Sequence, residues 1–172
     1  MPVRPTADDT VDVLLPVEEM IAGLDAVLGP RGMQLVRESR RSLHRGLYLA
    51  ASSLLAAASE AAWFNLARAV KQPGAKLQGL IESGRDIAEV IRLTEQHLTE
   101  IRVVRSLITE VVSQAHLFRE IRNYALHPVE EHDADRETWL TETGATLLMI
   151  SARRYFVKLS RLHARLAGAE GT

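Results

Sequence analysis

The sequence predicts an all-α protein, a bundle of five or six helices. Its composition is rich in alanine, leucine and arginine, which favour helices, and only 5% of its residues are aromatic. Apolar residues recur at three- and four-residue spacings over most of the chain, whereas alternating β-branched patterns and Asn-Gly turns are absent. With 172 residues, the chain is long enough for one domain with a core. We expect that domain over 13–172, after a tail at 1–12 that lacks periodicity.

Two helical segments are predicted in the first 70 residues. The first follows Pro16, since proline suits the first position of a helix. Helical spacing of apolar residues continues over 17–28, and the Gly-Pro-Arg-Gly run at 29–32 should end it. A long helical pattern then covers about 33–70. Gly46 favours a bend in it, whereas the alanine-rich second half favours a continuous core helix.

The stretch GLYLAASSLLAAASEAAWF has about the length of a membrane span, but its composition favours a buried central helix. Glu60 interrupts it, and its alanines and serines make it only mildly apolar. We expect Glu60 to be a satisfied buried acid, paired with an arginine of another helix, and a role at a site stays open. No membrane association is expected. The absence of cysteine and of an apolar leader fits a cytoplasmic protein.

After a break at the Lys-Gln-Pro-Gly run, a short helix is predicted over 75–82, with Ser-Gly as its stop. The apolar stripe that restarts at Ile87 continues for some 40 residues. A single helix of that length would be about 60 Å long, too long for a domain of this size. We therefore expect a break near 99–106.

The end of the chain should form one more long helix. Pro128 ends the preceding segment, because the residue before a proline is pushed out of the α region. A polar loop follows, in which Asp135 is expected to cap the next helix. That helix is predicted over 136–166.

The strongest candidate site is the stretch REIRNYALHP, which begins at Arg119 and closes the penultimate helical segment. Residues four apart share a helical face, so Arg119, Asn123 and His127 are predicted to form one stripe. Arg122 lies beside that stripe. It is separated from His127 by roughly 140° around an ideal helix. The two converge only if the helix ends near His127, and the proline that follows supplies such an end.

The chemistry of this set suits a phosphate substrate. An imidazole can transfer a proton, and a guanidinium can hold a phosphate through two parallel hydrogen bonds. An amide such as that of Asn123 can orient either group or the substrate. No His-Glu-x-x-His run or other metal-ligand spacing is present, so no metal site is predicted. The alternative is that His127 caps the helix, with Arg122 and Asn123 as ordinary surface residues.

The stretch RNYALHP resembles the R-x4-6-H motif of the HEPN superfamily, in which a polar residue commonly follows the arginine. Arg122 matches the arginine, Asn123 the polar residue and His127 the histidine. The alanine-rich run YLAASSLLAAASEAAW also resembles the core helix of bacterial HEPN-like proteins. The resemblance covers most of 33–166. It implies a HEPN-like helical bundle that dimerises, with the motif helices meeting at the interface.

The resemblance also implies a metal-independent endoribonuclease of a toxin–antitoxin or defence system, with RNA or a nucleotide as ligand, no cofactor and a possible antitoxin partner. In that mechanism His127 transfers protons, Arg122 stabilises charge on the phosphate, and Asn123 positions His127 or the substrate. Arg119 is added as a phosphate contact on geometry alone, and Tyr124 because it lies within the motif. Other superfamily members lack demonstrated catalysis, so the alternative is a catalytically silent dimerisation module that binds nucleotide, RNA or protein.

Charge is unevenly distributed along the chain. Residues 1–30 have a net charge of −5, and residues 31–45 have a net charge of +4. These segments either face each other or form a partner surface. The last predicted helix carries a basic stripe, which is either a solvated face, a partner of the acidic N-terminal segment or a footprint for an RNA backbone. The stripe consists of Arg154, Lys158, Arg161 and Arg165.

Overall fold

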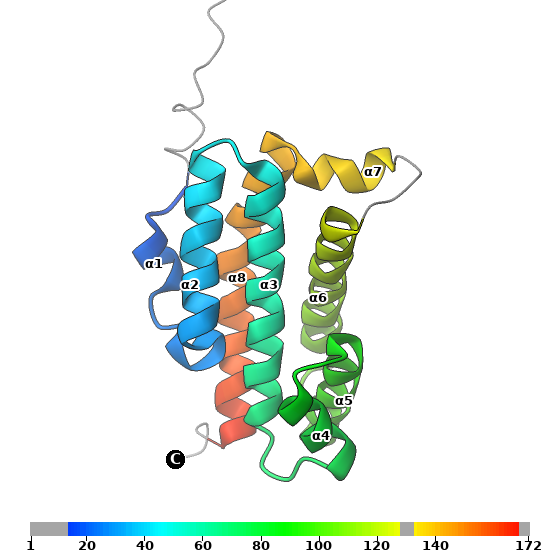
Figure 1. The fold of residues 1–172 in the computed structure, drawn as a ribbon. Coiled ribbons are helices and arrows are strands. Elements are labelled where there is room, and N and C mark those ends of the chain that lie inside the picture. Colours follow the sequence, from blue (N-terminus) through cyan, green and yellow to red (C-terminus); the bar gives the residue numbers. More distant parts are fainter. Residues whose placement is uncertain (1–13, 128–132, 169–172) are drawn as a thin grey trace, which may run out of the picture.

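The computed structural model describes residues 14–127 and 133–168 (Figure 1). This part of the chain contains helices and no strand, which confirms the all-α class. The predicted tail at 1–12 lies outside the described residues. The helices are α1 (Val17–Ile21), α2 (Asp25–His44), α3 (Tyr48–Arg68), α4 (Ala75–Ser83), α5 (Ile87–Glu100), α6 (Arg105–Leu126), α7 (Ala134–Glu137), a 3-10 helix (Thr138–Leu140) and α8 (Glu142–Ala167).

The alanine-rich helix α3 lies at the centre of the molecule. It contacts α2, α5, α6 and α8, and Figure 1 shows it between the α2 and α8 pair and α6. Small residues on its buried faces let these helices approach closely: Ala51, Ser52, Ala56, Ala58, Ser59 and Ala62. The predicted buried central helix is therefore confirmed. Within the described ranges, no helix is long and apolar enough to cross a membrane.

Helices α2 and α3 form an antiparallel pair, so the pattern over 33–70 is not one continuous helix. The reversal occurs at Gly46, whose φ of 71° lies in the left-handed region that favours glycine. Its backbone N–H donates to Leu43 O at 3.0 Å, and that of Leu47 donates to Ser42 O at 2.9 Å. These two bonds are those of a Schellman motif, which ends α2 and lets the chain turn back.

The predicted stop at 29–32 appears as a kink inside α2. Gly29 has a φ of 63° and a ψ of 175°, and Pro30 follows it. Asn65 of α3 donates its side-chain amide to Val27 O at 3.0 Å, which satisfies a carbonyl just before the kink. A Cβ on Gly29 would lie 2.8 Å from that amide nitrogen, so the kink is packed closely against α3.

In the second half of the chain, the predicted short helix corresponds to α4, which ends at Gly84 in the left-handed conformation. The expected break near 99–106 is confirmed, since α5 ends at Glu100 and α6 begins at Arg105. Helix α5 lies beside the first half of α6 rather than extending it. The long apolar stripe is therefore shared between two helices that both pack on α3.

The predicted cap and start of the last helix are wrong. Asp133, not Asp135, caps a short helix: its Oδ1 accepts from the backbone N–H groups of Asp135 and Arg136 at 3.1 and 3.2 Å. The long helix α8 starts later, at Glu142, where the Thr141 hydroxyl accepts from Gly144 N at 3.2 Å. The extended backbone of Thr141, with a ψ of 169°, separates α8 from the preceding 3-10 helix.

A buried polar cluster joins α3 to α8. The hydroxyl of Tyr155 accepts a hydrogen bond from Trp63 Nε1 at 2.8 Å and lies 2.7 Å from Ser59 Oγ. All three residues are at most 2% exposed. Burial raises the pKa of the Tyr155 phenol, so the hydroxyl stays protonated and can donate as well as accept. Both hydrogen bonds run between α3 and α8, so the cluster ties these two helices together.

We expect Tyr155→Phe to destabilise the fold by about 1–3 kcal/mol, because Trp63 Nε1 and Ser59 Oγ would lose their partner in a site without water access. Ser59→Ala should cost less, since the bond between Trp63 and Tyr155 remains. Urea unfolding followed by circular dichroism would measure both. Equal stabilities of wild type and Tyr155→Phe would show that the cluster does not contribute to the fold.

Candidate functional site

The motif predicted from the sequence lies at the end of α6. The last helical residue is Leu126, and His127 has an extended backbone with a φ of −104° and a ψ of 127°. The backbone N–H of His127 donates to Asn123 O at 3.0 Å and closes the final turn. The helix thus ends at the predicted place, but His127 has left it. His127 therefore does not continue the helical stripe of Arg119 and Asn123, contrary to our expectation.

The imidazole of His127 is exposed. Within the described residues its side chain forms no hydrogen bond or ion pair. An imidazole acting as a helix cap would bond the last free carbonyls of α6. That contact is not made here, so the side chain stays available to a ligand.

Arg122 is held by Glu60 of the central helix. Arg122 Nη1 lies 3.0 Å from Glu60 Oε1, and the side chains of Arg122 and Glu60 are 38% and 18% exposed. This ion pair links α6 to α3 at a half-buried position between the two helices. It confirms the expectation that the lone acid of the alanine-rich stretch pairs with an arginine of another helix.

Two arginines act on the Glu60 carboxylate. Burial raises the pKa of Glu60, while the charge and hydrogen bond of Arg122 and the charge of Arg119 oppose that rise. Arg119 and Arg122 are one helical turn apart, so both guanidinium groups lie on the side of α6 that meets Glu60. The site therefore combines two cations with one half-buried anion at the end of a helix.

Within the described residues, the side chains of the remaining candidates form no hydrogen bond or ion pair with this group. The hydroxyl of Tyr124 accepts from Asp133 N at 3.4 Å, which links the end of α6 to the start of α7. The side chain of Asn123 is half-buried. The structure thus brings Arg119, Arg122 and Glu60 together, and it places Asn123, Tyr124 and His127 nearby in sequence at the same helix end.

Glu60 was absent from the predicted site, although its type and position carried a usable signal. An acid in a long apolar helix must find a cation, because an unpaired buried carboxylate is costly. The sequence could not identify which arginine would pair with it. That choice depends on how α3 and α6 pack.

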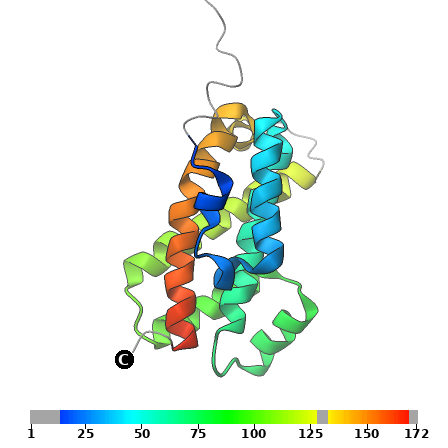
Figure 2. The same ribbon diagram turned by 90° about the vertical axis from the view of Figure 1, so that its left-hand side faces the viewer.

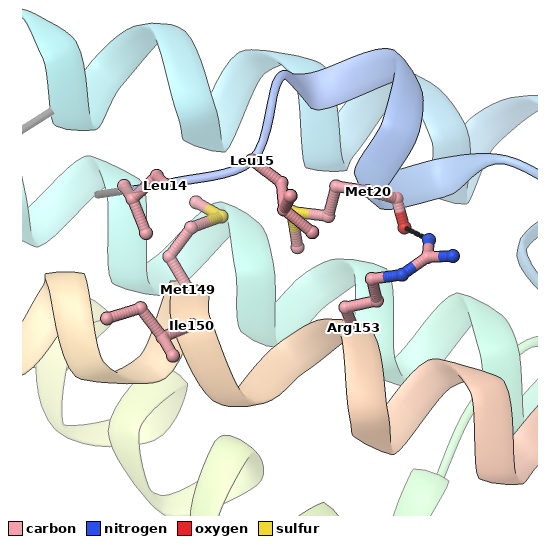
Figure 3. Close-up of a pocket in the computed structure, with 6 residues that line it drawn as sticks. All are labelled: Leu14, Leu15, Met20, Met149, Ile150 and Arg153. Carbon is pink, nitrogen blue, oxygen red and sulfur yellow. Dashed lines mark hydrogen bonds between the residues drawn. The ribbon is translucent and has the colours of Figure 1, made fainter. Parts of the chain in front are cut away.

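A small apolar pocket lies on another part of the molecule, between the segment before α1 and α8 (Figure 3). Arg153 closes one end of it by donating to Glu19 O at 2.5 Å and to Met20 O at 2.7 Å. The remaining lining side chains are Leu14, Leu15, Met20, Met149 and Ile150. The guanidinium of Arg153 is hydrogen-bonded to these backbone carbonyls, and the other lining side chains are apolar. We therefore interpret the pocket as part of the packing of α1 and the segment before it on α8, and not as a catalytic site. Figure 2 shows α1 between α2 and α8.

The basic stripe of α8 is paired mainly with α6 and the loop before it. Lys158 and Arg154 both approach Glu110, Lys158 in a close ion pair and Arg154 at 3.9 Å. Arg165 lies 3.5 Å from the carbonyls of Ile101 and Arg102. The described contacts therefore favour a structural use of these three cations, and none of them involves the acidic N-terminal segment.

The acidic and basic segments near the N-terminus do meet at one point. Glu18 and Arg37 form a bidentate pair, with Arg37 Nε and Nη2 at 2.8 and 2.9 Å from the two carboxylate oxygens. This hydrogen bond lowers the pKa of Glu18. The expectation that the segments face each other is met here, and Asp8, Asp9 and Asp12 lie outside the described residues.

The fold and the site define an all-helical protein whose candidate chemistry lies where α6 ends against the central helix. In the described part of the chain, no three histidine, aspartate or glutamate side chains gather where they could hold a metal ion. Comparisons with protein-family models, with curated proteins and with solved structures find no match for this chain. The residues of the site and their geometry are therefore the support for a function.

Proposed function

We propose that this chain is a metal-independent endoribonuclease of the HEPN type that acts in a toxin–antitoxin or defence system. The observation that carries the proposal is the arrangement at the end of α6. There Arg122 is anchored on one side by Glu60, and five residues later the exposed imidazole of His127 forms no hydrogen bond or ion pair with the described residues. The all-α fold with an alanine-rich central helix supports the same interpretation.

The proposed reaction is an internal transesterification of RNA. The ribose 2′-hydroxyl attacks the adjacent phosphorus, and the bond from phosphorus to the 5′-oxygen breaks. His127 transfers the protons of the attacking and leaving oxygens, and Arg122 stabilises the charge that develops on the phosphate oxygens. Arg119 supplies a second phosphate contact, and Asn123 and Tyr124 orient the substrate. The products carry a 2′,3′-cyclic phosphate and a 5′-hydroxyl.

The test is an RNA-cleavage assay with the purified full-length protein in excess EDTA, over a broad panel of structured and single-stranded RNAs. We expect cleavage that leaves the two product ends named above, identified by mass spectrometry. A wild-type protein that cleaves no RNA in the panel would overturn the proposal.

One observation favours the alternative, a catalytically silent dimerisation module that binds nucleotide, RNA or protein. Arg122 is paired with Glu60, and this pair serves the packing of α6 on α3 whether or not Arg122 contacts a phosphate. Such a module would leave RNA intact, and an anisotropy titration would show whether it binds RNA or nucleotide. This outcome separates the alternative from the ribonuclease in the same set of samples.

We expect the protein to be a homodimer in which the ends of the two α6 helices meet. Leu126, the last residue of α6, is 56% exposed and offers an apolar contact beside the site. Multi-angle light scattering at micromolar concentration should show twice the chain mass of 19.1 kDa. Leu126→Glu should shift the protein toward the monomer, because two buried like charges would face each other. A wild-type species of 19.1 kDa alone would contradict the dimer.

A further inference from the structure

The carboxylate of Glu60 meets the motif region from a different helix. Glu60 belongs to the central helix α3, 62 positions before Arg122 in the sequence, and its side chain is 18% exposed. We propose that Glu60 is a positioning residue for the Arg122 guanidinium during RNA cleavage. The inference rests on the proposed function and adds a residue that lies outside the motif.

Among the described residues, the guanidinium of Arg122 keeps N–H donors that no partner engages. A guanidinium has five N–H donors in a planar fork, and Glu60 engages Arg122 through Nη1. The side chain of Arg122 is 38% exposed, so the other edge of the fork can face a phosphate. A long arginine side chain has several rotatable bonds, and an anchor at one nitrogen limits the directions in which the others point. Glu60 therefore orients the group without occupying all of it.

The same carboxylate offsets part of the charge of the site. Arg119 and Arg122 both act on Glu60, and both lower its pKa against the effect of burial. Without this anion the two arginines would attract a phosphate more strongly. Loss of Glu60 should thus have opposite effects on two steps: RNA binds more tightly, while the freed guanidinium stabilises the transition state less well.

Two variants of similar length separate these effects. Glu60→Gln removes the charge but keeps an oxygen that can accept the hydrogen bond from Arg122. Glu60→Met removes both the charge and the acceptor, and it fills the same space with an apolar chain, which protects the fold. Glu110→Met is the matched control, because it breaks an ion pair with Lys158 elsewhere on α6.

The experiment is steady-state RNA cleavage at pH 8 in EDTA. Binding of a 2′-deoxy oligonucleotide, which lacks the attacking hydroxyl, is measured in parallel. We expect Glu60→Met to lower kcat by about 10²-fold, the order of loss for a misplaced catalytic group. Glu60→Gln should keep kcat within about tenfold of wild type, because its amide retains the hydrogen bond. Both should lower KM and bind the deoxy oligonucleotide more tightly, and Glu110→Met should match wild type.

A further variant, Glu60→Met with Arg122→Ala, should have the same kcat as Arg122→Ala alone, because Glu60 acts through Arg122. If Glu60→Met cleaves with the wild-type kcat, or if Glu60→Gln loses as much as Glu60→Met, the positioning role is overturned and the ribonuclease proposal stands. Weaker binding and lower melting temperature in both variants, with kcat unchanged, would assign Glu60 a purely structural role. If wild type cleaves no RNA, the proposed function fails and the positioning role fails with it.

Discussion

Replacement of His127 by alanine is expected to lower the rate constant of RNA cleavage by about 10²–10⁴-fold, the usual contribution of a positioned proton-transfer group. The fold should be nearly unaffected. His127 lies just beyond the last turn of α6, and its side chain is exposed and forms no hydrogen bond with the described residues. The helical circular dichroism signal and the melting temperature should therefore stay within a few degrees of wild type, since exposed positions of this kind typically change stability by less than about 0.5 kcal/mol.

The matched control is His116→Ala, an exposed histidine on the same helix, which should cleave at the wild-type rate. Arg122→Lys should fail to restore full activity, because an ammonium group cannot make the bidentate contact of a guanidinium. The assay is cleavage of a fluorescent RNA in EDTA under single-turnover conditions. Cleavage by His127→Ala at the wild-type rate would contradict a catalytic role, and unfolding of this variant would support the capping alternative instead.

The second large effect is expected on stability, from Gly144→Ala. A Cβ at Gly144 would lie 2.0 Å from Thr138 O and 2.7 Å from Trp139 Cα. Both neighbours are backbone atoms of the 3-10 helix that crosses the first turn of α8, so they cannot rotate away. Overpacking typically lowers the free energy of unfolding by roughly 1–3 kcal/mol, and we expect Gly144→Ala to lower it by an amount at or above the upper end of this range. For a chain of this length, about 3 kcal/mol lowers the melting temperature by roughly 6–12 °C.

Gly79→Ala provides the control with the opposite sign. Gly79 is exposed in the middle of α4, and a Cβ there would meet nothing within 4 Å. Alanine should stabilise that helix by about 0.5–1 kcal/mol, because it has less backbone entropy to lose than glycine. Differential scanning calorimetry would measure both variants. An unchanged melting temperature for Gly144→Ala would mean that the 3-10 helix does not pack against α8 as described.

The sequence by itself determined the helical class, the central helix and most of the breaks, because these features depend on local chemistry. The Lys-Gln-Pro-Gly run follows the end of α3, and Gly84 ends α4 in the left-handed conformation. The apolar stripe that starts at Ile87 is too long for one helix, which predicted the break between α5 and α6. The end of α6 near His127 follows from the proline after it. Each of these signals acts within a few residues of the position that it sets.

Tertiary structure alone decided the features that depend on distant parts of the chain. The residues on both sides of Gly46 have a helical pattern, so the sequence left open whether one helix continues through it or the chain bends. The packing of α2 along α3 decides that the chain reverses at Gly46. The start of α8 depends on the approach of the 3-10 helix to Gly144. The partner of Glu60 is Arg122 because α3 and α6 pack side by side, and an ion pair across 62 positions has no local signature. Local propensity can place a helix end, but only packing determines which side chains meet there.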